Sequence, residues 1–384
     1  MRIAVLGVGL IGGSIGLAAK EHVEDAEVVG FGRDPARLQG ALDRGAIDRV
    51  AGSVEEAVGG AQLCFACAPV GALPELVRTA LEASGPDTLV TDVGSTKEDL
   101  VSRTPDPRFV GGHPIAGAET AGVEHARADL FQGAVWYLTP HEQSGGLLYE
   151  RLHRFVRDVG ARPVAVDAAT HDRLVAVFSH LPHVLANVLA SQAAARLSEH
   201  GEALRQVGPS FRDMTRVAGA NTAMWSDIYR SNAGAIVEEI RGFRRELDEV
   251  ERRLAEGEVE DWNDRAREDR RALLEAGAAE GPVHELRLTV PNRPGIVAQV
   301  ALELGRAGVN IVDMALAPAS DMRTGAMSLW IAGDAQAQRA SELISGLGFP
   351  VGSELRTPRS SSPPARSGAT TRRRRTSRSR TARR

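Results

Sequence analysis

A glycine-rich turn directly after a short apolar run, near the start of the chain, constrains the fold more than any other feature. Residues 2–6 read RIAVL, a run of the kind that is buried in a parallel sheet, and Gly7, Gly9 and Gly12 follow at once. In this spacing the first glycine permits a tight turn, the second lets a pyrophosphate approach the backbone, and the third lets a helix pack on the strand. A helix from Ser14 onward would also direct free N–H groups at the phosphates. The pattern predicts a dinucleotide-binding unit.

The end of the second apolar run, residues 27–31, bears on which dinucleotide binds. An acidic residue there usually accepts hydrogen bonds from the ribose 2′-OH of NAD. This chain has Arg33 and then Asp34. Asp34 could accept these hydrogen bonds from one or two positions beyond the usual one, or Arg33 could bind the 2′-phosphate of NADP. We expect NAD and leave NADP open. Further nucleotide contacts are expected from two residues inside the glycine pattern and from a proline after a later strand, Leu10, Ile11 and Pro69.

Strand and helix patterns alternate through the first part of the chain. Apolar runs at residues 62–66, 88–91 and 134–138 are separated by helical patterns, which is typical of a doubly wound parallel sheet. We therefore assign residues 1–166 to a Rossmann domain of the α/β class.

Long helical patterns follow. Residues 171–200, 226–253 and 262–276 have helical periodicity with few β-branched runs, so we assign residues 167–280 to an all-α domain. Alanines are frequent in residues 184–197, which would allow helices to pack closely, including across a homodimer.

A third unit, residues 284–356, follows a linker of small residues and has the order strand, helix, strand, strand, helix, strand. That order is typical of a ferredoxin-like α+β domain. The expected strands are residues 285–290, 309–317, 326–331 and 349–352, and the expected helices are residues 295–307 and 334–347.

Charge is distributed unevenly along the chain. Residues 357–384 contain ten arginines and no acidic residue, and this Ser/Thr/Arg/Pro composition is typical of a disordered, solvated tail. The other 356 residues carry 36 basic and 50 acidic side chains, a net charge of −14. Because such an acidic body is poorly suited to binding nucleic acid, we expect no nucleic-acid partner.

Cysteine content and hydropathy indicate the compartment. Two cysteines exclude a disulfide scaffold and favour a reducing cytoplasm. Cys64 and Cys67 lie within an apolar strand, and no second thiol pair completes a metal site, so we expect buried structural cysteines and no metal. Apolar runs fall short of the ~18 residues that span a bilayer, so no membrane helix is expected.

Three segments carry residues suited to chemistry. Ser95 follows a strand, at the carboxyl edge of the sheet where ligands bind in such folds. His113 stands in the glycine-rich segment GGHPIAG, which we expect to be a loop. Two histidines flank Pro182 in the segment SHLPH, residues 179–183, inside a helical pattern where a proline kink would free backbone groups.

Four motifs in order give the chain a resemblance to a known family. They are VGSTK at residues 93–97, GHPIAG at 112–117, SHLPH at 179–183 and FRDMTR at 211–216. Together they resemble the prephenate dehydrogenase family, which also includes arogenate dehydrogenases. The resemblance covers about residues 1–276 and implies an NAD(P)-dependent oxidative decarboxylation in tyrosine biosynthesis.

The resemblance implies a role for each matching residue. His113 would accept the proton of the ring hydroxyl, a task that suits a neutral imidazole near pH 7. Ser95 would hydrogen-bond the same hydroxyl or orient His113. Arg216 would anchor a substrate carboxylate through its guanidinium, the alternative being an exposed helical pair with Asp213. Three further residues would bind the substrate or wall its pocket, His183, Ser179 and Trp225.

The third unit resembles an ACT domain, a module that commonly binds an amino acid as a feedback effector. The resemblance rests on VPNRPG at residues 290–295 and GVNI at 308–311. It implies an effector, expected to be tyrosine, held around Asn292, Gly295 and Asn310.

One departure from the family leaves the substrate open. The family often has a threonine where this chain has Ala118, near the end of the substrate at which prephenate and arogenate differ. Two rival functions remain. A β-hydroxyacid dehydrogenase or imine reductase would use a catalytic lysine or other acid in the helical domain, and an amino-acid sensor would keep the nucleotide fold without its chemistry. We expect a cytoplasmic homodimeric enzyme acting on prephenate or arogenate.

Overall fold

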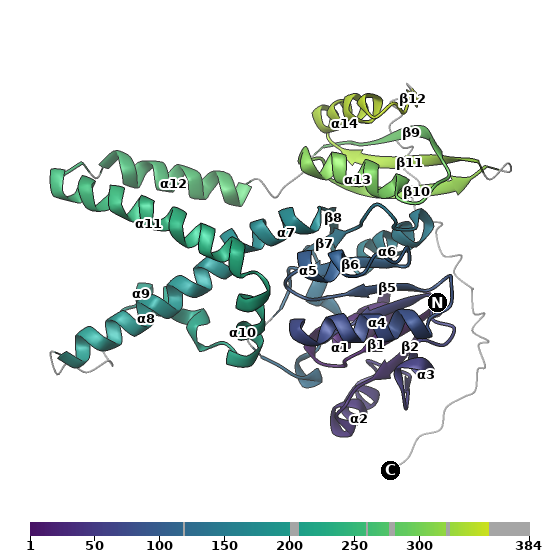
Figure 1. Ribbon diagram of the computed structural model, residues 1–384, viewed down its shortest axis with the longest axis horizontal. Coiled ribbons are helices and arrows are strands. Elements are labelled where there is room, and N and C mark those ends of the chain that lie inside the picture. The colour runs from purple at the N-terminus through teal and green to yellow at the C-terminus, as the bar shows by residue number, and fades with distance from the viewer. Residues whose placement is uncertain (118–119, 200–206, 259, 276–280, 320–322, 353–384) are drawn as a thin grey trace, which may run out of the picture.

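The computed structural model describes residues 1–117, 120–199, 207–258, 260–275, 281–319 and 323–352. Figure 1 shows three parts: an α/β lobe, a helical arm that projects from one side of it, and a small α/β unit that rests on the lobe. The arginine-rich tail predicted at residues 357–384 lies outside the described residues, as does Ala118.

The lobe is built on an eight-stranded sheet in the order β3-β2-β1-β4-β5-β6-β7-β8. Alternate residues of β1 enter different cores: Ile3 and Val5 pack on one face of the sheet, and Ala4 and Leu6 on the other. The strands are β1 Arg2–Leu6, β2 Glu27–Phe31, β3 Arg49–Val50, β4 Leu63–Ala66, β5 Leu89–Asp92, β6 Phe109–Pro114, β7 Val135–Thr139 and β8 Arg162–Ala165. The helices are α1 Leu10–His22, α2 Pro35–Asp43, α3 Val54–Val58, α4 Leu73–Ala83, α5 Glu98–Ser102 and α6 Gly146–Asp158.

The prediction of a wholly parallel sheet was wrong at one position. Strands β1 to β6 pair in parallel, but β7 runs antiparallel to β6, with Gly112 opposite Leu138 and His113 opposite Tyr137. A parallel neighbour needs a crossover connection, usually a helix. The described residues between β6 and β7 contain only two short 3₁₀ turns, η2 Val123–His125 and η3 Ala128–Phe131, so the chain returns antiparallel.

The helical arm begins at the lobe with α7 and continues through a π turn into α8. Its elements are α7 Ala168–Val175, the π turn Ala176–His180, α8 Leu181–Glu199, α9 Pro209–Thr215, η6 Arg216–Gly219, α10 Thr222–Ser231, α11 Ala233–Glu256 and α12 Glu260–Glu275. The sequence predicted one helix over residues 226–253, and this was wrong. The structure ends α10 at Ser231 and begins α11 at Ala233. Asn232 between them has non-helical backbone angles (φ −119°, ψ 25°), and its buried side chain contacts Asp172 and His180.

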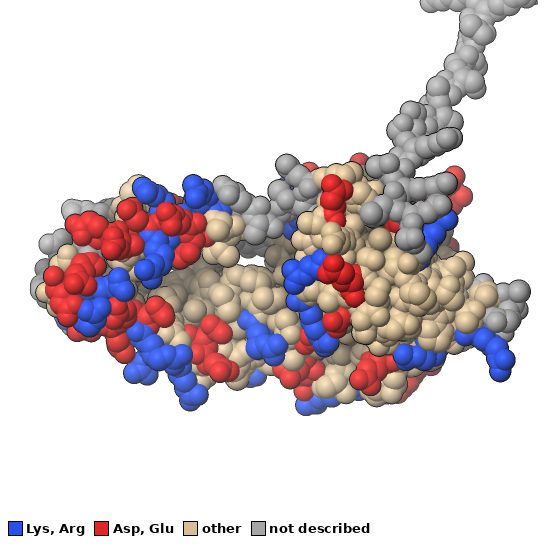
Figure 2. Space-filling view, turned by 90° about the horizontal axis from the view of Figure 1, so that it is seen from above, with Lys and Arg blue, Asp and Glu red and all other residues tan. Residues whose placement is uncertain are grey.

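Acidic and basic side chains are intermixed over the outer part of the arm (Figure 2). Arg252 forms ion pairs with Glu249 and Glu256 on one face of α11. These are exposed pairs at helical spacing, which contribute little each to stability.

One helical run in the arm, Ala168–Ser198, is long and apolar enough by length and composition to cross a membrane, although the sequence analysis expected no such helix. The same composition suits a helix packed within a protein. His171, His180 and His183 lie along this run, buried and in hydrogen-bond contact with His113, Asn232 and Tyr229 of other elements, as packing requires.

The third unit has a four-stranded antiparallel sheet in the order β10-β11-β9-β12 and two helices. Its elements are β9 Val283–Pro291, α13 Ile296–Arg306, β10 Ile311–Pro318, β11 Thr324–Ala332, α14 Asp334–Gly346 and β12 Val351–Gly352. One hydrophobic core contains both Phe155 of α6 and Val300 of α13, so this unit and the lobe pack as one body. Arg157 of α6 forms an ion pair with Asp313 of β10 across the junction.

Candidate active site

The glycine-rich turn has the geometry that nucleotide binding needs. Gly7 adopts φ +107°, and a Cβ there would collide with the carbonyl of Cys67. Gly12 holds α1 against the turn, since a Cβ there would collide with the carbonyl of Gly7. Gly9, the N-cap of α1, has no atom within 4 Å of the position a Cβ would take. The backbone is therefore open where the N–H groups of α1 are free, and a pyrophosphate fits this cradle.

The other expected nucleotide contacts lie around the same edge. Leu10 and Ile11 are half-buried in the first turn of α1, and Pro69 is exposed just after β4. Asp34 does not have a free carboxylate: its Oδ1 accepts the N–H groups of Ala36 (3.0 Å) and Arg37 (3.4 Å). Its Oδ2 pairs with the Arg37 guanidinium at 3.2 Å. Asp34 thus serves as the N-cap of α2, and Arg33 beside it is exposed.

Both cysteines are free in the structure. Cys64 is fully buried, and burial raises the pKa of its thiol to about 12. A thiol in this state is chemically inert, as a structural cysteine should be.

His113 lies in strand β6, so the prediction that it stands in a loop was wrong. The glycines before it allow the strand to pack closely rather than making it irregular: a Cβ on Gly112 would lie 2.7 Å from the carbonyl of Asp92. His113 is at the carboxyl end of β6, half-buried, on the sheet edge where ligands bind in such folds. Burial, followed by the charges of His171, Lys97 and His180, holds the pKa of His113 well below its ordinary range.

A buried ion pair supports the end of β6. The Asp92 carboxylate accepts the N–H groups of Gly94 (2.8 Å) and Gly112 (3.1 Å) and pairs with the Lys97 ammonium. Lys97 is fully buried, so it is neither a surface lysine nor a free amine. The pair ties the loop after β5 to the strand that carries His113.

Two residues of α7 reach His113 from the helical arm. The His113 Nδ1 lies 2.9 Å from the His171 Nε2, and the His171 Nδ1 lies 2.8 Å from the Asp172 Oδ1. Asp172 also accepts the backbone N–H groups of Lys97 (2.8 Å) and Glu98 (2.9 Å). Burial lowers the pKa of His171, although the hydrogen bond to Asp172 opposes this. The structure thus orients His113 through His171, in a role that the sequence analysis gave to Ser95.

His180 connects this group to the rest of the arm. The Asn232 side-chain amide donates to the Asp172 carbonyl at 2.7 Å and lies 3.1 Å from the His180 Nδ1. Burial lowers the pKa of His180 to about 4. The His180 ring meets the Trp225 ring edge-on, with centroids 6.0 Å apart.

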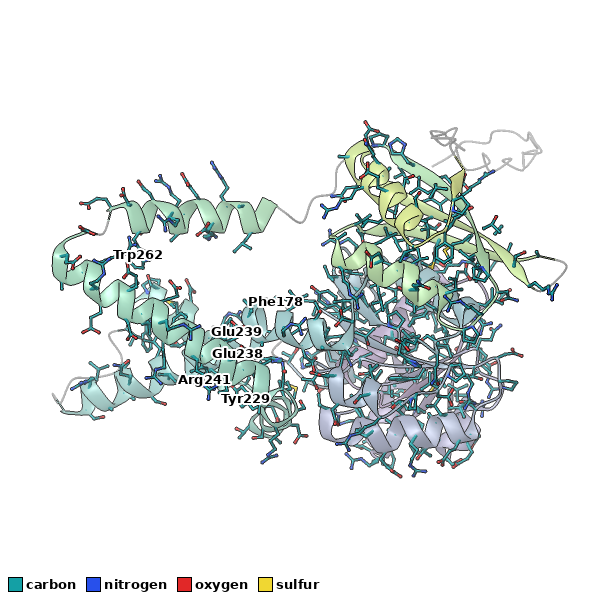
Figure 3. The ribbon with its side chains drawn as sticks, turned by 45° about the horizontal axis from the view of Figure 1, so that its top comes forward. Phe178, Tyr229, Glu238, Glu239, Arg241 and Trp262 are labelled. Atoms are coloured by element: carbon teal, nitrogen blue, oxygen red, sulfur yellow. The ribbon has the colours of Figure 1, made fainter. Side chains whose placement is uncertain are left out.

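Trp225 and His183 wall a cavity of about 190 Å³ at the base of the arm. Their rings stack with centroids 3.5 Å apart and an interplanar angle of 15°. The His183 Nδ1 lies 2.6 Å from the Tyr229 hydroxyl, and the Asn187 amide donates to the same hydroxyl at 3.2 Å. The His183 Nε2 is buried with no hydrogen-bond partner among the described residues. Figure 3 places Tyr229 where the arm meets the lobe.

Three expected site residues lie outside these contacts. Ser95 is half-buried in the loop after β5, and Ser179 is half-buried in the π turn. Arg216 begins η6, exposed, two residues before Ala218, which lines the cavity. A π turn is common at functional sites, and here it ends two residues before Pro182, where the sequence predicted a kink.

The sequence singled out His180, in the segment SHLPH, but gave it no role of its own. Sequence reasoning missed His171, Asp172, Asn187, Tyr229 and Asn232. These had no local signal, because their partners come from distant elements.

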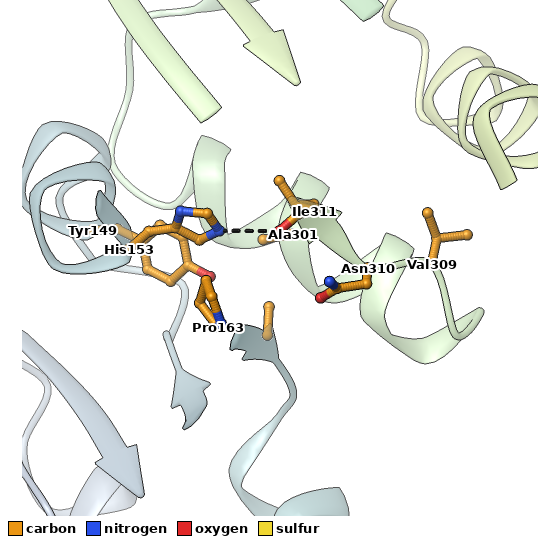
Figure 4. Close-up of a pocket in the computed structure, with 8 residues that line it drawn as sticks. Tyr149, His153, Pro163, Ala301, Val309, Asn310 and Ile311 are labelled. Atoms are coloured by element: carbon orange, nitrogen blue, oxygen red, sulfur yellow. Dashed lines mark hydrogen bonds between the residues drawn. The ribbon is translucent and has the colours of Figure 1, made fainter. Parts of the chain in front are cut away.

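Two of the expected effector residues, Gly295 and Asn310, lie on the side of the third unit that faces the lobe. Gly295 adopts φ +78°, and a Cβ there would collide with the carbonyl of Glu142. Asn310 lines a cavity of about 10 Å³ with Tyr149 and His153 of α6 (Figure 4). That is room for about one water molecule. Asn292 is exposed on the loop before α13.

Family models match two stretches of the chain. Residues 15–165 match the prephenate dehydrogenase nucleotide-binding domain, and residues 167–267 match the prephenate dehydrogenase dimerization domain. Prephenate dehydrogenase of Bacillus subtilis is 29% identical over 355 residues, which cover 89% of this chain and 95% of that protein. Prephenate dehydrogenase of Lactococcus lactis subsp. cremoris is 31% identical over 312 residues, which cover 78% of this chain and 85% of that protein.

A solved structure agrees with these matches. The crystal structure of prephenate dehydrogenase from A. aeolicus, in complex with hydroxyphenyl propionate and NAD+, has a TM-score of 0.67 and 28% identity to this chain. The match covers 72% of this chain and 98% of that one. The prediction of a Rossmann-like nucleotide-binding domain followed by a helical domain is confirmed.

Proposed function

The chain belongs to the prephenate dehydrogenase family, and on that premise we propose that it oxidatively decarboxylates prephenate to 4-hydroxyphenylpyruvate in tyrosine biosynthesis. The enzyme is an NAD(P)-dependent oxidoreductase. One observation carries the proposal for the site. A neutral histidine at the carboxyl end of the nucleotide-binding sheet is linked, through buried side chains, to a cavity walled by His183 and Trp225.

His113 is the general base of the proposed reaction. The ring carbon that bears the hydroxyl loses a hydride, the hydroxyl loses its proton, and the bond to the ring carboxylate breaks to release CO₂. The nicotinamide cofactor, when bound, accepts the hydride. His113 takes the hydroxyl proton, and its lowered pKa keeps it neutral for this task near pH 7. The ring oxygen regains a proton as the aromatic product forms.

The chain supplies cationic and donor groups for a dianionic substrate. His183 lines the cavity, and its buried Nε2, which has no partner among the described residues, is the nitrogen left to bind the substrate. Arg216 anchors a carboxylate by approaching from η6, the segment that also contributes Ala218 to the cavity. Ser95 and Ser179 bind the substrate from the loop after β5 and from the π turn, and Trp225 excludes water on one side.

Cofactor choice follows from the end of β2. NAD binding fits the cradle at Gly9. The Asp34 carboxylate already caps α2 and pairs with Arg37, so it is a weaker acceptor for a ribose 2′-OH than the acidic residue of most NAD enzymes. Arg33 makes NADP the second candidate.

The third unit serves as an ACT regulatory domain that binds tyrosine. Its β-α-β-β-α-β order and its strand order support this reading. Because Gly295 and Asn310 lie against the lobe, an amino acid at these residues requires the unit to shift on α6. A homodimer in the cytoplasm fits a dimerization domain whose helices expose Val177 and Val188.

The lysine content argues against one form of a rival function. A hydroxyacid dehydrogenase would use a catalytic lysine or another acid in the helical domain, and the whole sequence holds only Lys20 and Lys97. Neither lies after residue 166, and Lys97 is paired with Asp92.

The test is the rise of reduced-nicotinamide absorbance with purified protein. We expect turnover of prephenate with NAD+, and the same assay ranks NADP+ and arogenate. Turnover of arogenate alone would keep the mechanism and change the substrate. No turnover of either substrate with either cofactor would contradict the proposed function.

A further inference from the structure

His113, His171 and Asp172 form a hydrogen-bonded chain that crosses from the sheet to the helical arm. His171 is fully buried and Asp172 is 2% exposed. The nitrogen-to-nitrogen distance between His113 and His171 is 2.9 Å, and the nitrogen-to-oxygen distance between His171 and Asp172 is 2.8 Å. Both are ordinary hydrogen-bond distances. Each link therefore has one donor and one acceptor, and the position of every proton can be worked out.

The position of each proton follows from the ionisation state of Asp172, at one end of the three side chains. Two backbone N–H groups, of Lys97 and Glu98, point at its carboxylate, one at each oxygen. Such donors stabilise an ionised carboxylate, which can only accept hydrogen bonds. The His171 Nδ1 must then donate to Asp172. Because burial lowers the pKa of His171, the ring is neutral near pH 7 and its Nε2 carries a lone pair.

The same logic continues to His113. The His171 Nε2 can only accept, so the His113 Nδ1 carries the proton that joins the two rings. A neutral imidazole has one N–H, so the lone pair of His113 is on Nε2. Without these partners both tautomers of His113 would be populated.

We propose that His171 and Asp172 are positioning residues that fix His113 in the tautomer with a basic Nε2, the nitrogen that accepts the substrate proton. The inference rests on the proposed function for the identity of the reaction, but not for the tautomer itself. Asn232, between α10 and α11, donates to the backbone carbonyl of Asp172 at 2.7 Å and so ties α7 to the rest of the arm.

A matched pair of substitutions at His171 tests the proposal. The amide oxygen of His171→Gln reaches the place of Nε2 and can still accept from His113. The shorter side chain of His171→Asn can keep only the contact to Asp172. We expect kcat to fall about 10²–10³-fold in His171→Asn and to stay within about fivefold of the parent in His171→Gln. KM and the dissociation constant for NAD+ should change little in either variant.

A merely structural role for His171 predicts a different pattern. Equal losses in both variants, or losses in KM and NAD+ affinity that parallel the loss of kcat, would overturn the proposal. Thermal unfolding of each variant identifies a failure to fold. If His171→Asn does not fold, Asp172→Asn replaces it, because a neutral amide lacks the negative charge that holds the proton on the His171 Nδ1. We expect that variant to lose about 10²–10⁴ in kcat, and normal turnover would overturn the proposal.

A second readout needs no substrate. In protein labelled with ¹⁵N-histidine, the His113 signals are assigned by their loss in His113→Asn. We expect a protonated Nδ1 and an unprotonated Nε2 in the parent enzyme, and a mixture of the two tautomers in Asp172→Asn. If the parent enzyme shows this tautomer but does not oxidise prephenate or arogenate, the proposed function fails and the positioning inference stands. A protonated Nε2 in the parent overturns the inference whatever the enzyme oxidises.

Discussion

His113 and His183 are two histidines of one site that their neighbours prepare for opposite tasks. The Nδ1 of His113 donates to His171, so its Nε2 is a base. The Nδ1 of His183 faces the Asn187 amide at 3.4 Å, and an amide nitrogen only donates, so the His183 Nδ1 is an acceptor. The His183 Nε2 therefore carries a proton in the neutral ring. The partner of Nδ1, and not the residue type, therefore decides whether a histidine accepts a proton or binds an anion.

The two neighbourhoods differ in how they achieve this. His113 depends on a buried carboxylate, Asp172, two side chains away. His183 depends on neutral groups, the Tyr229 hydroxyl and the Asn187 amide, and on the stacked Trp225 ring. The hydrogen bonds that support His113 are the stronger of the two sets because they end at an ionised carboxylate, and hydrogen bonds to ionised groups are about twice as strong as neutral ones. Changes around His113 should consequently have larger effects than changes around His183.

The largest effect is expected from removing the base. Replacing His113 with Asn should lower kcat by about 10²–10⁴ because no other described group takes its place. Nucleotide binding should remain close to that of the parent, since the Gly9 cradle is untouched. The measurements are steady-state turnover and calorimetric titration with NAD+. Near-normal turnover would show that His113 is not the base.

Acid should have the next largest effect, on His113 and not on His183. A base works only when neutral, and the pKa of His113 is well below the ordinary value of 6.5 because of burial. We expect kcat/KM to stay flat as the pH falls through 6.5 and then to fall about tenfold per pH unit below the pKa of His113. An acid limb centred at or above pH 6.5 would contradict the burial argument.

Acid should also weaken folding, through His180. Its pKa is about 4 in the folded chain, while an unfolded histidine takes up its proton near 6.5. Between these values the unfolded state binds more protons, so the free energy of unfolding should fall as the pH falls from 6.5 to 4. The slope from this residue is at most about 1.4 kcal/mol per pH unit. Urea unfolding of the parent and of His180→Gln, compared at pH 7 and pH 5, measures the difference.

The smallest effect should come from the support of His183. Replacing Tyr229 with Phe removes the hydroxyl that meets the His183 Nδ1 at 2.6 Å but keeps the ring. The loss of one neutral hydrogen bond is about 1 kcal/mol, so we expect KM for the substrate to rise about fivefold with kcat nearly unchanged. A larger fall in kcat than in kcat/KM would show that Tyr229 takes part in the chemical step. The neighbours of His183 and of His113 would then no longer differ in role.

Local pattern was sufficient for much of the fold. The spacing of Gly7, Gly9 and Gly12 predicted the first strand, turn and helix, because the constraint lies within one continuous segment. The antiparallel β7 and the break at Asn232 were not predictable in this way. Each depends on a partner far along the chain, such as the Asp172 carbonyl 60 residues from Asn232.

For the site, the sequence alone determined which residues could do chemistry: His113, His183, Ser95, Arg216 and the glycines at the nucleotide edge. Only the tertiary structure decided what the histidines do. It placed His113 in a strand instead of a loop, buried Lys97 in an ion pair, and brought His171 to His113 from 58 residues away, with Asp172 beside it. The physical reason is that pKa and tautomer are set by burial and by the partner on the other ring nitrogen, and both come from segments that meet only when the chain is folded.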